Sequence, residues 1–259
     1  MQKLKISKEK VLPWLLPVII VGSWEGVIRM NWVTSDLIPA PTTILVNAWS
    51  LLKSGQLQEN LSVSLYRATL GFLIGGGSGF ILGILNGIFK TSRLLLDGTI
   101  QMLRNIPHLS LIPLLILFLG IGESSKIVLV AIGCLFPIYV NTYHGITSVD
   151  AKLIEMGRSY GMNQRQLFAK VIFPGALPSI LMGVRYALGV MWTTLIVAET
   201  VSSSSGIGYM ANDAQQFTNM DTIMLCIIIY ALFGKLSDMI AKNLEDILLT
   251  WQQLEVEGS

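Results

Sequence analysis

The residues best placed to do chemistry are polar and ionisable side chains that interrupt long apolar stretches. Arg104, Asn105 and His108 lie in the segment QMLRNIPHLSLIPLL, which also contains two prolines. A charged side chain at the centre of a membrane costs about 2.5–3.5 kcal/mol on insertion scales, so it should face protein or a wet cavity. Broken helices are tolerated at membrane depth under the same condition. The segment is therefore predicted to line a polar path.

A second candidate group occupies the apolar stretch 177–201. It contains Arg185 and Trp192, and Arg185 lies only two turns past Pro178. Arg185 either lines the same path or extends its charge to the cytoplasmic face, and the residues leave both readings open. Glu199 is either a helix-end acid or the partner of a buried arginine.

Long apolar stretches supply the elements that would position these residues. Hydrophobic residues make up 52% of the chain and charged residues 13%, which is typical of a polytopic membrane protein. The predicted fold class is all-α, with about six transmembrane helices in a single domain, residues 1–259. The first stretch contains Pro13, Pro17, Glu25 and Arg29 and is interpreted as a retained span rather than a cleaved signal. The predicted spans are 11–30, 61–89, 95–119, 126–146, 177–201 and 222–244.

Lysine and arginine are distributed unevenly among the loops. Most of these residues lie before the first predicted span, between the second and third, or between the fourth and fifth. The loops on the other side of the membrane hold mainly Lys53, and the loop 202–221 holds no basic residue. By the positive-inside rule, both termini and the segment 147–177 are predicted to be cytoplasmic, in a multi-pass protein of the cell inner membrane. The residues on which this rests are Lys3, Lys5, Lys8, Lys10, Lys90, Arg93, Lys152, Arg158, Arg165 and Lys170.

Three shorter segments carry weaker signals. Within 31–60, the start at Pro41 resembles a helix entry and predicts a short helix at the outer surface. The loop SSSSGIGY, residues 202–209, has hydroxyls and amides that suit an anion's oxygens, although a plain turn is an equal reading. Residues 254–259 are interpreted as a cloning remnant without function.

Glycines recur at intervals of four residues in the stretch 61–89. Such a stripe exposes backbone along one helix face, so that another helix can approach closely where lipid offers no hydrophobic drive. We therefore expect the stripe to serve helix packing rather than solute contact. Its members are Gly71, Gly75, Gly79, Gly83 and Gly87.

The segment 147–177 is polar and charged within an otherwise apolar chain. Asp150 begins a predicted short amphipathic helix that ends near Tyr160. Gly161 permits a turn, and Asn163 is a predicted N-cap for a second helix up to Ile172. Within the first helix, Glu155 and Arg158 have the spacing of an ion pair. The segment is predicted to form a helix–turn–helix knob on the cytoplasmic side.

The spacing in this knob resembles the EAA motif of ABC importer permeases. That motif has Glu-Ala-Ala, three residues, Gly, nine residues, Ile, one residue and Leu-Pro. Glu155, Gly161 and Pro174 stand at matching positions, whereas Met156 and Gly157 replace the two alanines. The resemblance implies that Glu155 to Pro174, with Arg158 among them, forms a coupling helix region that seats on an ATPase subunit.

ATP hydrolysis itself is not expected of this chain. No stretch reads G-x-x-x-x-G-K-[ST], so the chain is predicted not to be an enzyme and to bind no cofactor. Cys134 and Cys226 are isolated in apolar stretches and are interpreted as small hydrophobic residues. His108 and His144 also lack companion ligands, so no metal site is predicted. The isolated cysteines predict no disulfide.

Nearly the whole chain, from about Leu12 to Trp251, resembles permeases of aliphatic sulfonate ABC importers, in the sulfonate, taurine and nitrate group of binding-protein-dependent transport permeases. The resemblance implies a type I importer permease fold, a homodimer, two ATP-binding subunits that use ATP and Mg, and a solute-binding protein, with membrane lipid around them and no nucleic acid. Taurine, nitrate and bicarbonate are alternative solutes. The segments that carry the resemblance are IQMLRNIPHLSLIPL, GIGESSKIVLVAIGCLFPIYVNTYHGI, PGALPSILMGVRYALGVMW and AETVSSSSGIGY.

Two other classes of protein remain as hypotheses. An ion-coupled secondary transporter would use Arg104, Glu199 or Asp97 as coupling groups, but no paired repeat of broken spans is evident. An intramembrane enzyme would use His108 and His144, but no nucleophile or carboxylate motif accompanies them. The importer permease is the leading hypothesis.

Overall fold

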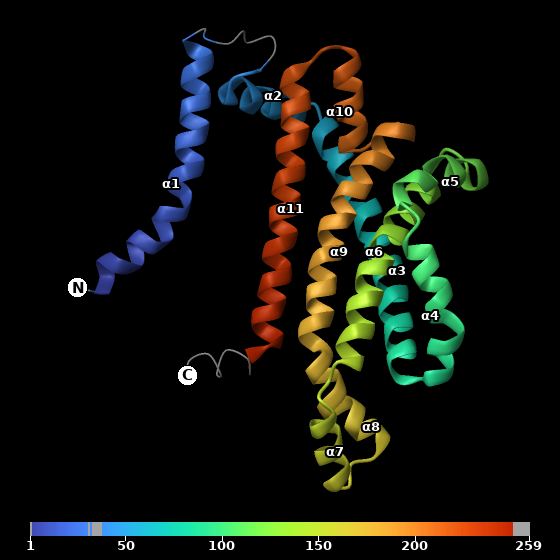
Figure 1. Cartoon of the computed structure of the whole chain (residues 1–259). Coiled ribbons are helices and arrows are strands. Elements are labelled where there is room, and N and C mark those ends of the chain that lie inside the picture. Colours follow the sequence, from blue (N-terminus) through green and yellow to red (C-terminus); the bar gives the residue numbers. More distant parts are fainter. Residues whose placement is uncertain (1, 31, 33–37, 251–259) are drawn as a thin grey trace.

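The computed structural model describes residues 2–30, 32 and 38–250, with side chains from residue 15 onward (Figure 1). The described residues form helices and no strand. The predicted remnant at 254–259 and the beginning of the first predicted span lie outside the fully described residues. The helices are α1 (Gln2–Arg29), α2 (Pro41–Lys53), α3 (Gln56–Ile88), α4 (Lys90–Arg104), η1 (His108–Leu111), α5 (Ile112–Leu119), α6 (Glu123–Thr147), α7 (Ala151–Ser159), α8 (Gln164–Leu167), η2 (Phe168–Ile172), α9 (Phe173–Ser202), α10 (Ile207–Gln216) and α11 (Met220–Leu248).

Four of these helical segments are long and apolar enough to cross a membrane: Gln56–Ile88, Glu123–Thr147, Gln164–Ser202 and Met220–Leu248. A bent pair, Lys90–Arg104 with His108–Leu119, makes a fifth if the pair is one span. Among the described residues, α1, which contains nearly all of the first predicted span, does not meet this criterion of length and apolar composition. The helix predicted within 31–60 is present as α2, which begins at Pro41.

The centre of the molecule is the packing of α3 on α6, and it depends on the glycine stripe. A Cβ on Gly71 would lie 2.6 Å from Val130 Cβ, and one on Gly83 would lie 2.6 Å from Thr142 Cβ. Gly75 and Gly79 are closer still, because each faces the main chain of α6, at Ala131 and Leu135 respectively. Gly87 completes the stripe, since a Cβ there would lie 2.8 Å from Ile146 Cγ2. Only a hydrogen at Cα lets the two backbones approach so closely.

The third predicted span, 95–119, is not one straight helix. α4 ends at Arg104, the chain turns through Asn105 to Pro107, and the following helix runs at 85° to α4. Pro107 cannot continue the helix because it lacks an N–H and disfavours helical geometry in the residue before it. The break places η1 and α5 against α6 rather than in line with α4.

The second half of the chain completes the core. α9 crosses next to α6, and Ala187, Met191, Trp192 and Leu195 of α9 are buried in one cluster with α3 and α6 residues. Cys134 belongs to this cluster and Cys226 to a second one between α2, α10 and α11, so both act as small hydrophobic residues. α7 and α8 project beyond one end of this block, and α10 lies at the other end (Figure 1).

Candidate functional site

The knob, residues 147–177, depends on local capping interactions. The Asp150 carboxylate accepts a hydrogen bond of 2.9 Å from the Lys152 amide and so caps the first turn of α7. After α7, Gly161 has φ +76°, a left-handed conformation that glycine adopts without penalty. Asn163 and Gln166 then form a reciprocal capping box at the start of α8. The predicted helix–turn–helix is therefore present, with α8 continuing through the π-helical turn η2 into α9.

Gly157 has a packing role in this knob. It is buried, and a Cβ there would lie 2.8 Å from Leu167 Cδ1 and 3.4 Å from Met162 Sδ. Glycine at this position therefore lets α7 fold tightly back on α8. This contact gives a physical reason for the departure from alanine at the third position of the motif.

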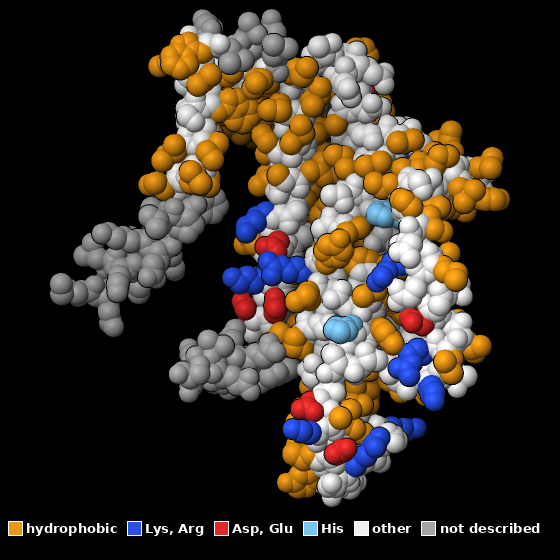
Figure 2. Space-filling model, viewed as in Figure 1, with side chains coloured by type: hydrophobic (Ala, Val, Ile, Leu, Met, Phe, Trp, Pro, Cys, Tyr) orange, Lys and Arg blue, Asp and Glu red, His pale blue; other side chains and the backbone are white. Residues whose placement is uncertain are grey.

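The outer surface of α7 has exposed apolar side chains. Leu153, Met156 and Tyr160 are 46%, 50% and 78% exposed. Glu155 and Arg158 are also exposed, and the ion pair that their spacing suggested is not formed in the described structure. Pro174 is the second residue of α9 and directly follows the π-helical turn η2. The knob thus presents a mixed apolar and charged surface at the end of the molecule, and Figure 2 shows basic and acidic side chains gathered there.

The residues predicted for a solute path fall into two groups. Arg104 and Asn105 are exposed at the break after α4, and Asn105 donates a side-chain hydrogen bond to the Gln101 carbonyl. His108 is half-buried and its Nε2 lies 3.0 Å from Thr194 Oγ1. This first group therefore reaches α9 through His108 alone.

The second group, Arg185 and Trp192, faces α11. Arg185 is 46% exposed in its side chain and pairs with Asp238 at 2.6 Å. The Trp192 indole donates a 2.8 Å hydrogen bond to Ser237 and stacks on Phe233. Trp192 is only 7% exposed, so it is a core residue of the α9–α11 contact. The structure does not bring the five predicted path residues to one place.

The most extensive polar cluster was not predicted. It is centred on Arg67 of α3, which is fully buried, and is called here the Arg67 cluster: Arg67, Glu123, Glu199, Ser64 and Tyr230. Arg67 forms two hydrogen bonds of 2.6 Å to the Glu123 carboxylate and one of 2.9 Å to Glu199. Glu199 is fully buried and accepts further bonds from Ser64 and Tyr230. Glu199 was expected to be either a helix-end acid or the partner of a buried arginine, and the structure shows that it is the partner of Arg67.

The segment 203–208, which includes the start of α10, closes over this cluster. Gly208 N donates to Glu199 Oε2 at 2.8 Å, Ile207 N to Ser64 Oγ at 2.9 Å and Gly206 N to Asn60 Oδ1 at 2.7 Å. Gly206 has φ +109° and faces the Glu199 carboxylate so closely that no Cβ would fit. The amides that the sequence offered to an external anion are therefore occupied by the protein's own side chains, one of them a carboxylate.

A signal for Arg67 was present in the sequence. It is the only charged residue in the stretch 61–89, and a lone charge in a predicted span requires a partner. Its partners are 56 and 132 residues away in the chain, so no local spacing identified them. The two histidines considered together in the sequence lie apart in the fold, in η1 and in the last turn of α6.

Comparison with known proteins identifies the family of this chain. Residues 75–248 match the family model described as the binding-protein-dependent transport system inner membrane component. The chain belongs to this family. SsuC of Escherichia coli (strain K12), provisionally described as an aliphatic sulfonates transport permease protein, is 52% identical over 93% of this chain and 92% of its own length. SsuC of Bacillus subtilis (strain 168), described in the same words, is 46% identical over 92% of this chain and 86% of its own length.

Solved structures support the fold. An amino acid ABC transporter crystallised with histidines has a TM-score of 0.59 to this permease at 20% identity, over 77% of this chain and 96% of that chain. At this identity the similarity concerns the fold alone, which is that of a type I ABC importer permease. Its family membership and its apolar helices make this chain a multi-pass permease of the inner membrane.

Proposed function

We propose that this permease is the membrane-spanning subunit of an ATP-driven importer of aliphatic sulfonates. The observation that carries the proposal is the similarity, over more than nine-tenths of the chain, to two relatives described as aliphatic sulfonates transport permeases. The absence of a phosphate-binding G-x-x-x-x-G-K-[ST] stretch supports the assignment of ATP and Mg to separate subunits. A solute-binding protein would deliver the sulfonate from outside.

In this proposal the knob is the coupling region for an ATP-binding subunit. Its apolar face, Leu153, Met156 and Tyr160, is exposed in the single chain, and burial of such side chains provides free energy for docking. Glu155 and Arg158 are exposed beside them and are available for polar contacts with the same partner. Two ATP-binding subunits would dock on the knobs of two copies of this permease.

The proposed orientation puts the knob and both termini in the cytoplasm. Basic residues of the α3–α4 turn and of the knob support this, as does the lack of basic residues in 202–221. Figure 2 shows charged side chains over the α7–α8 end and the nearby half of α11, and hydrophobic ones around α5. The Arg67 cluster would then lie toward the outer side, with lipid around the apolar flanks.

The proposed solute path includes Arg104, Asn105 and His108 at the break between α4 and η1, with Arg185 nearer the cytoplasm. Arg104 and Asn105 are exposed in the single chain, and a polar surface at this depth suits a water-filled path between two copies better than lipid. Trp192 would support the wall of this path through its packing on Phe233 rather than touch the solute.

The test is uptake of labelled solutes by a strain that lacks this permease, with and without the gene restored. Alkanesulfonates, taurine, nitrate and bicarbonate are compared under sulfur or nitrogen limitation. Restored uptake confined to alkanesulfonates supports the proposal. Restored uptake confined to another anion leaves the permease role and rejects the sulfonate, and uptake without any ATP-binding subunit would favour an ion-coupled transporter.

The coupling role of the knob has its own test. Glu155→Lys should abolish uptake while the amount of permease in the membrane is unchanged, because Glu155 is exposed and supports no internal contact through its carboxylate. The matched control is Lys152→Glu, a charge change of the same size and opposite sign on the same short helix. Normal uptake by Glu155→Lys would remove this residue from the docking surface.

A further inference from the structure

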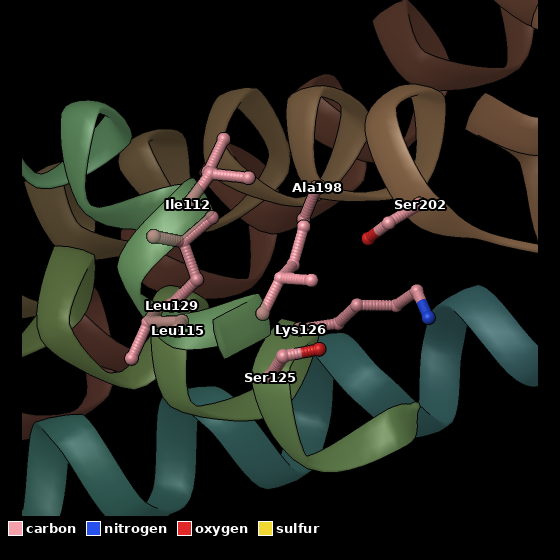
Figure 3. Close-up of a pocket in the computed structure, with 8 residues that line it drawn as sticks. Ile112, Leu115, Ser125, Lys126, Leu129, Ala198 and Ser202 are labelled. Atoms are coloured by element: carbon pink, nitrogen blue, oxygen red, sulfur yellow. The ribbon is translucent and has the colours of Figure 1, made fainter. Parts of the chain in front are cut away.

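The break between α4 and η1, which carries the proposed path residues, has two flanks that are held differently. On the α5 flank, Ile112 lies in a buried cluster with Leu129 of α6 and Ala198 of α9 (Figure 3). On the α4 flank, Ile100 is the only buried residue of the described helix. Apolar packing therefore holds α5 in place, whereas most of α4 is not packed into the core.

Hydrogen bonds attach α4 to the core instead, and they converge on Tyr139 of α6. Tyr139 is fully buried, and its hydroxyl donates a 2.7 Å hydrogen bond to Asp97 Oδ1 in the middle of α4. The same hydroxyl accepts a 2.8 Å hydrogen bond from Asn86 Nδ2 of α3. Asn86 in turn accepts a hydrogen bond from the Ser92 hydroxyl in the first turn of α4. Tyr139 thus links the carboxylate of α4 to the packed pair of α3 and α6.

Hydrogen bonds alone hold the Asp97 carboxylate. Besides Tyr139, the Gln101 side-chain amide donates to Asp97 Oδ1, at 3.3 Å. In the described part of the chain, Asp97 forms no salt bridge with a lysine, an arginine or a histidine. Asp97 is half-buried, so neither packing nor a fixed cation prevents its side chain from turning to another rotamer if the Tyr139 hydroxyl is lost.

Asp97 is the only acidic residue in the sequence of α4, and it lies near the proposed path. It precedes Arg104 by seven residues, which puts the two on the same helix face, about 10 Å apart along the axis. A carboxylate turned toward the path has the same sign of charge as a sulfonate, and it offsets the positive charge of Arg104. An anion path past Arg104 therefore works best when the Asp97 carboxylate points into the core.

We infer that Tyr139 is a positioning residue for anion transport: its hydroxyl holds the Asp97 carboxylate on the core and away from the solute path. The inference rests on the proposed function, in which a sulfonate passes Arg104, and it adds a residue that acts on the solute through Asp97. The hydroxyl suits this role because a hydrogen bond to a carboxylate is directional and about twice as strong as one between neutral groups. Asn86 donates to the phenol oxygen, so the single phenol hydrogen is directed to Asp97.

The experiment measures ethanesulfonate uptake against concentration in cells that carry each variant in place of the natural permease, together with the amount of permease in the membrane. Tyr139→Phe removes the hydroxyl and keeps the ring that stacks on Tyr143. Its maximal rate per permease should fall about fivefold, because the released carboxylate opposes the anion. KM should be unchanged, since the solute-binding protein captures the solute before it reaches the path. Asp97→Asn should import within about twofold of the natural chain, because the amide oxygen still accepts the phenol hydrogen.

Two double variants separate the effect of charge from the effect of packing. Tyr139→Phe also leaves the buried Asn86 amide without its acceptor, which is a structural loss unrelated to the solute. Tyr139→Phe/Asp97→Asn keeps this loss but has no charge to repel an anion, so its maximal rate should return to within about twofold of Asp97→Asn. Tyr139→Phe/Asp97→Glu keeps the charge and should stay slow. Tyr143→Phe is the matched control and should import normally, because the Tyr143 hydroxyl has no hydrogen-bond partner among the described residues.

The outcomes separate this inference from the proposed function. If Tyr139→Phe imports ethanesulfonate at the natural rate, or if Tyr139→Phe/Asp97→Asn stays as slow as Tyr139→Phe, the role of Tyr139 is overturned and alkanesulfonate import stands. If cells import only another anion, the sulfonate assignment fails, and the same variants are compared with that anion, because the inference depends only on its negative charge. Recovery in the Asp97→Asn double variant and not in the Asp97→Glu double variant then supports the inference without the sulfonate.

Discussion

The Arg67 cluster and the knob lie at opposite ends of α6 and use charge in opposite ways. In the Arg67 cluster, Arg67 and Glu199 are fully buried and each has several hydrogen-bond partners within the chain. In the knob, Glu155 and Arg158 are exposed, and Tyr160 is 78% exposed. The first region is completed by the chain itself, whereas the second presents a surface for a partner. Substitutions should therefore affect stability in one and assembly in the other.

The largest effect is expected for Arg67→Met. It leaves the Glu199 carboxylate buried without its cation, and removal of one partner of a buried pair costs about 3–5 kcal/mol. Unfolding of the purified permease in detergent, followed by circular dichroism against increasing denaturant, measures the loss. The double variant Arg67→Met/Glu199→Met should recover part of it, since the orphaned charge is gone.

The matched control for that change is Arg185→Met. Arg185 also pairs with a carboxylate, but both side chains are more than a third exposed, so a loss of less than about 1 kcal/mol is expected. Equal losses for the two arginines would contradict the contrast between a buried and an exposed charge in this fold.

The glycine stripe should give the next largest effect. Gly75→Leu places a side chain against the main chain of Ala131, which cannot move aside by changing a side-chain rotamer. Overpacking of this kind typically destabilises a protein by about 1–3 kcal/mol. The same denaturation measurement applies. Gly77→Leu is the control on the same helix, because a Cβ at Gly77 meets nothing within 4 Å. A Gly77→Leu variant as unstable as Gly75→Leu would mean that close packing of α3 on α6 is not the cause of the loss.

In the knob we expect a change in assembly with little change in stability. Met156→Ser/Tyr160→Ser removes exposed apolar side chains, so the free energy of unfolding should change by less than about 0.5 kcal/mol. Co-purification with the ATP-binding subunit should fall about tenfold, equivalent to about 1.4 kcal/mol of lost docking energy. Trp49→Ser, at another exposed aromatic residue on α2, should leave co-purification unchanged. Full co-purification of the double variant would show that docking uses another surface.

The smallest effect is expected for Gly157→Ala, which restores the second alanine of the EAA pattern. The added Cβ meets the end of a flexible side chain, Leu167 Cδ1, at 2.8 Å, while alanine improves helix propensity by about 1 kcal/mol. The two effects oppose each other, so uptake should remain within about twofold of the natural chain. A large loss of uptake would show that the tight fold of α7 on α8 is required for coupling.

Local features of the sequence were sufficient to predict the knob. Asp150, Gly161 and Asn163 act on backbone groups within a few residues of themselves, and the structure shows each in its expected capping or turn position. The apolar stretches likewise predicted the long helices, because burial or lipid contact favours a helix that satisfies its own backbone. The sharp break after α4 followed from Pro107, but the 85° angle did not, since it depends on how α5 packs on α6.

The surroundings of the predicted path residues were harder to predict, because they depend on which face of each helix is turned toward which neighbour. Trp192 was placed with the path residues, yet it packs against Phe233 and Ser237 of α11. Arg67 was overlooked, although it forms the most extensively bonded charge in the described residues. A single charge in a span indicates that a partner exists without indicating where that partner is.

The sequence by itself determined the membrane class, the principal helices, the knob and the membership of the permease group, because these depend on hydrophobicity, local capping and motif spacing. The tertiary structure alone decided which charges meet. Arg67 joins Glu123 and Glu199 across 56 and 132 residues of chain. Such contacts arise from the close approach of whole helices, which glycines on α3 permit, and no local pattern along the chain encodes them.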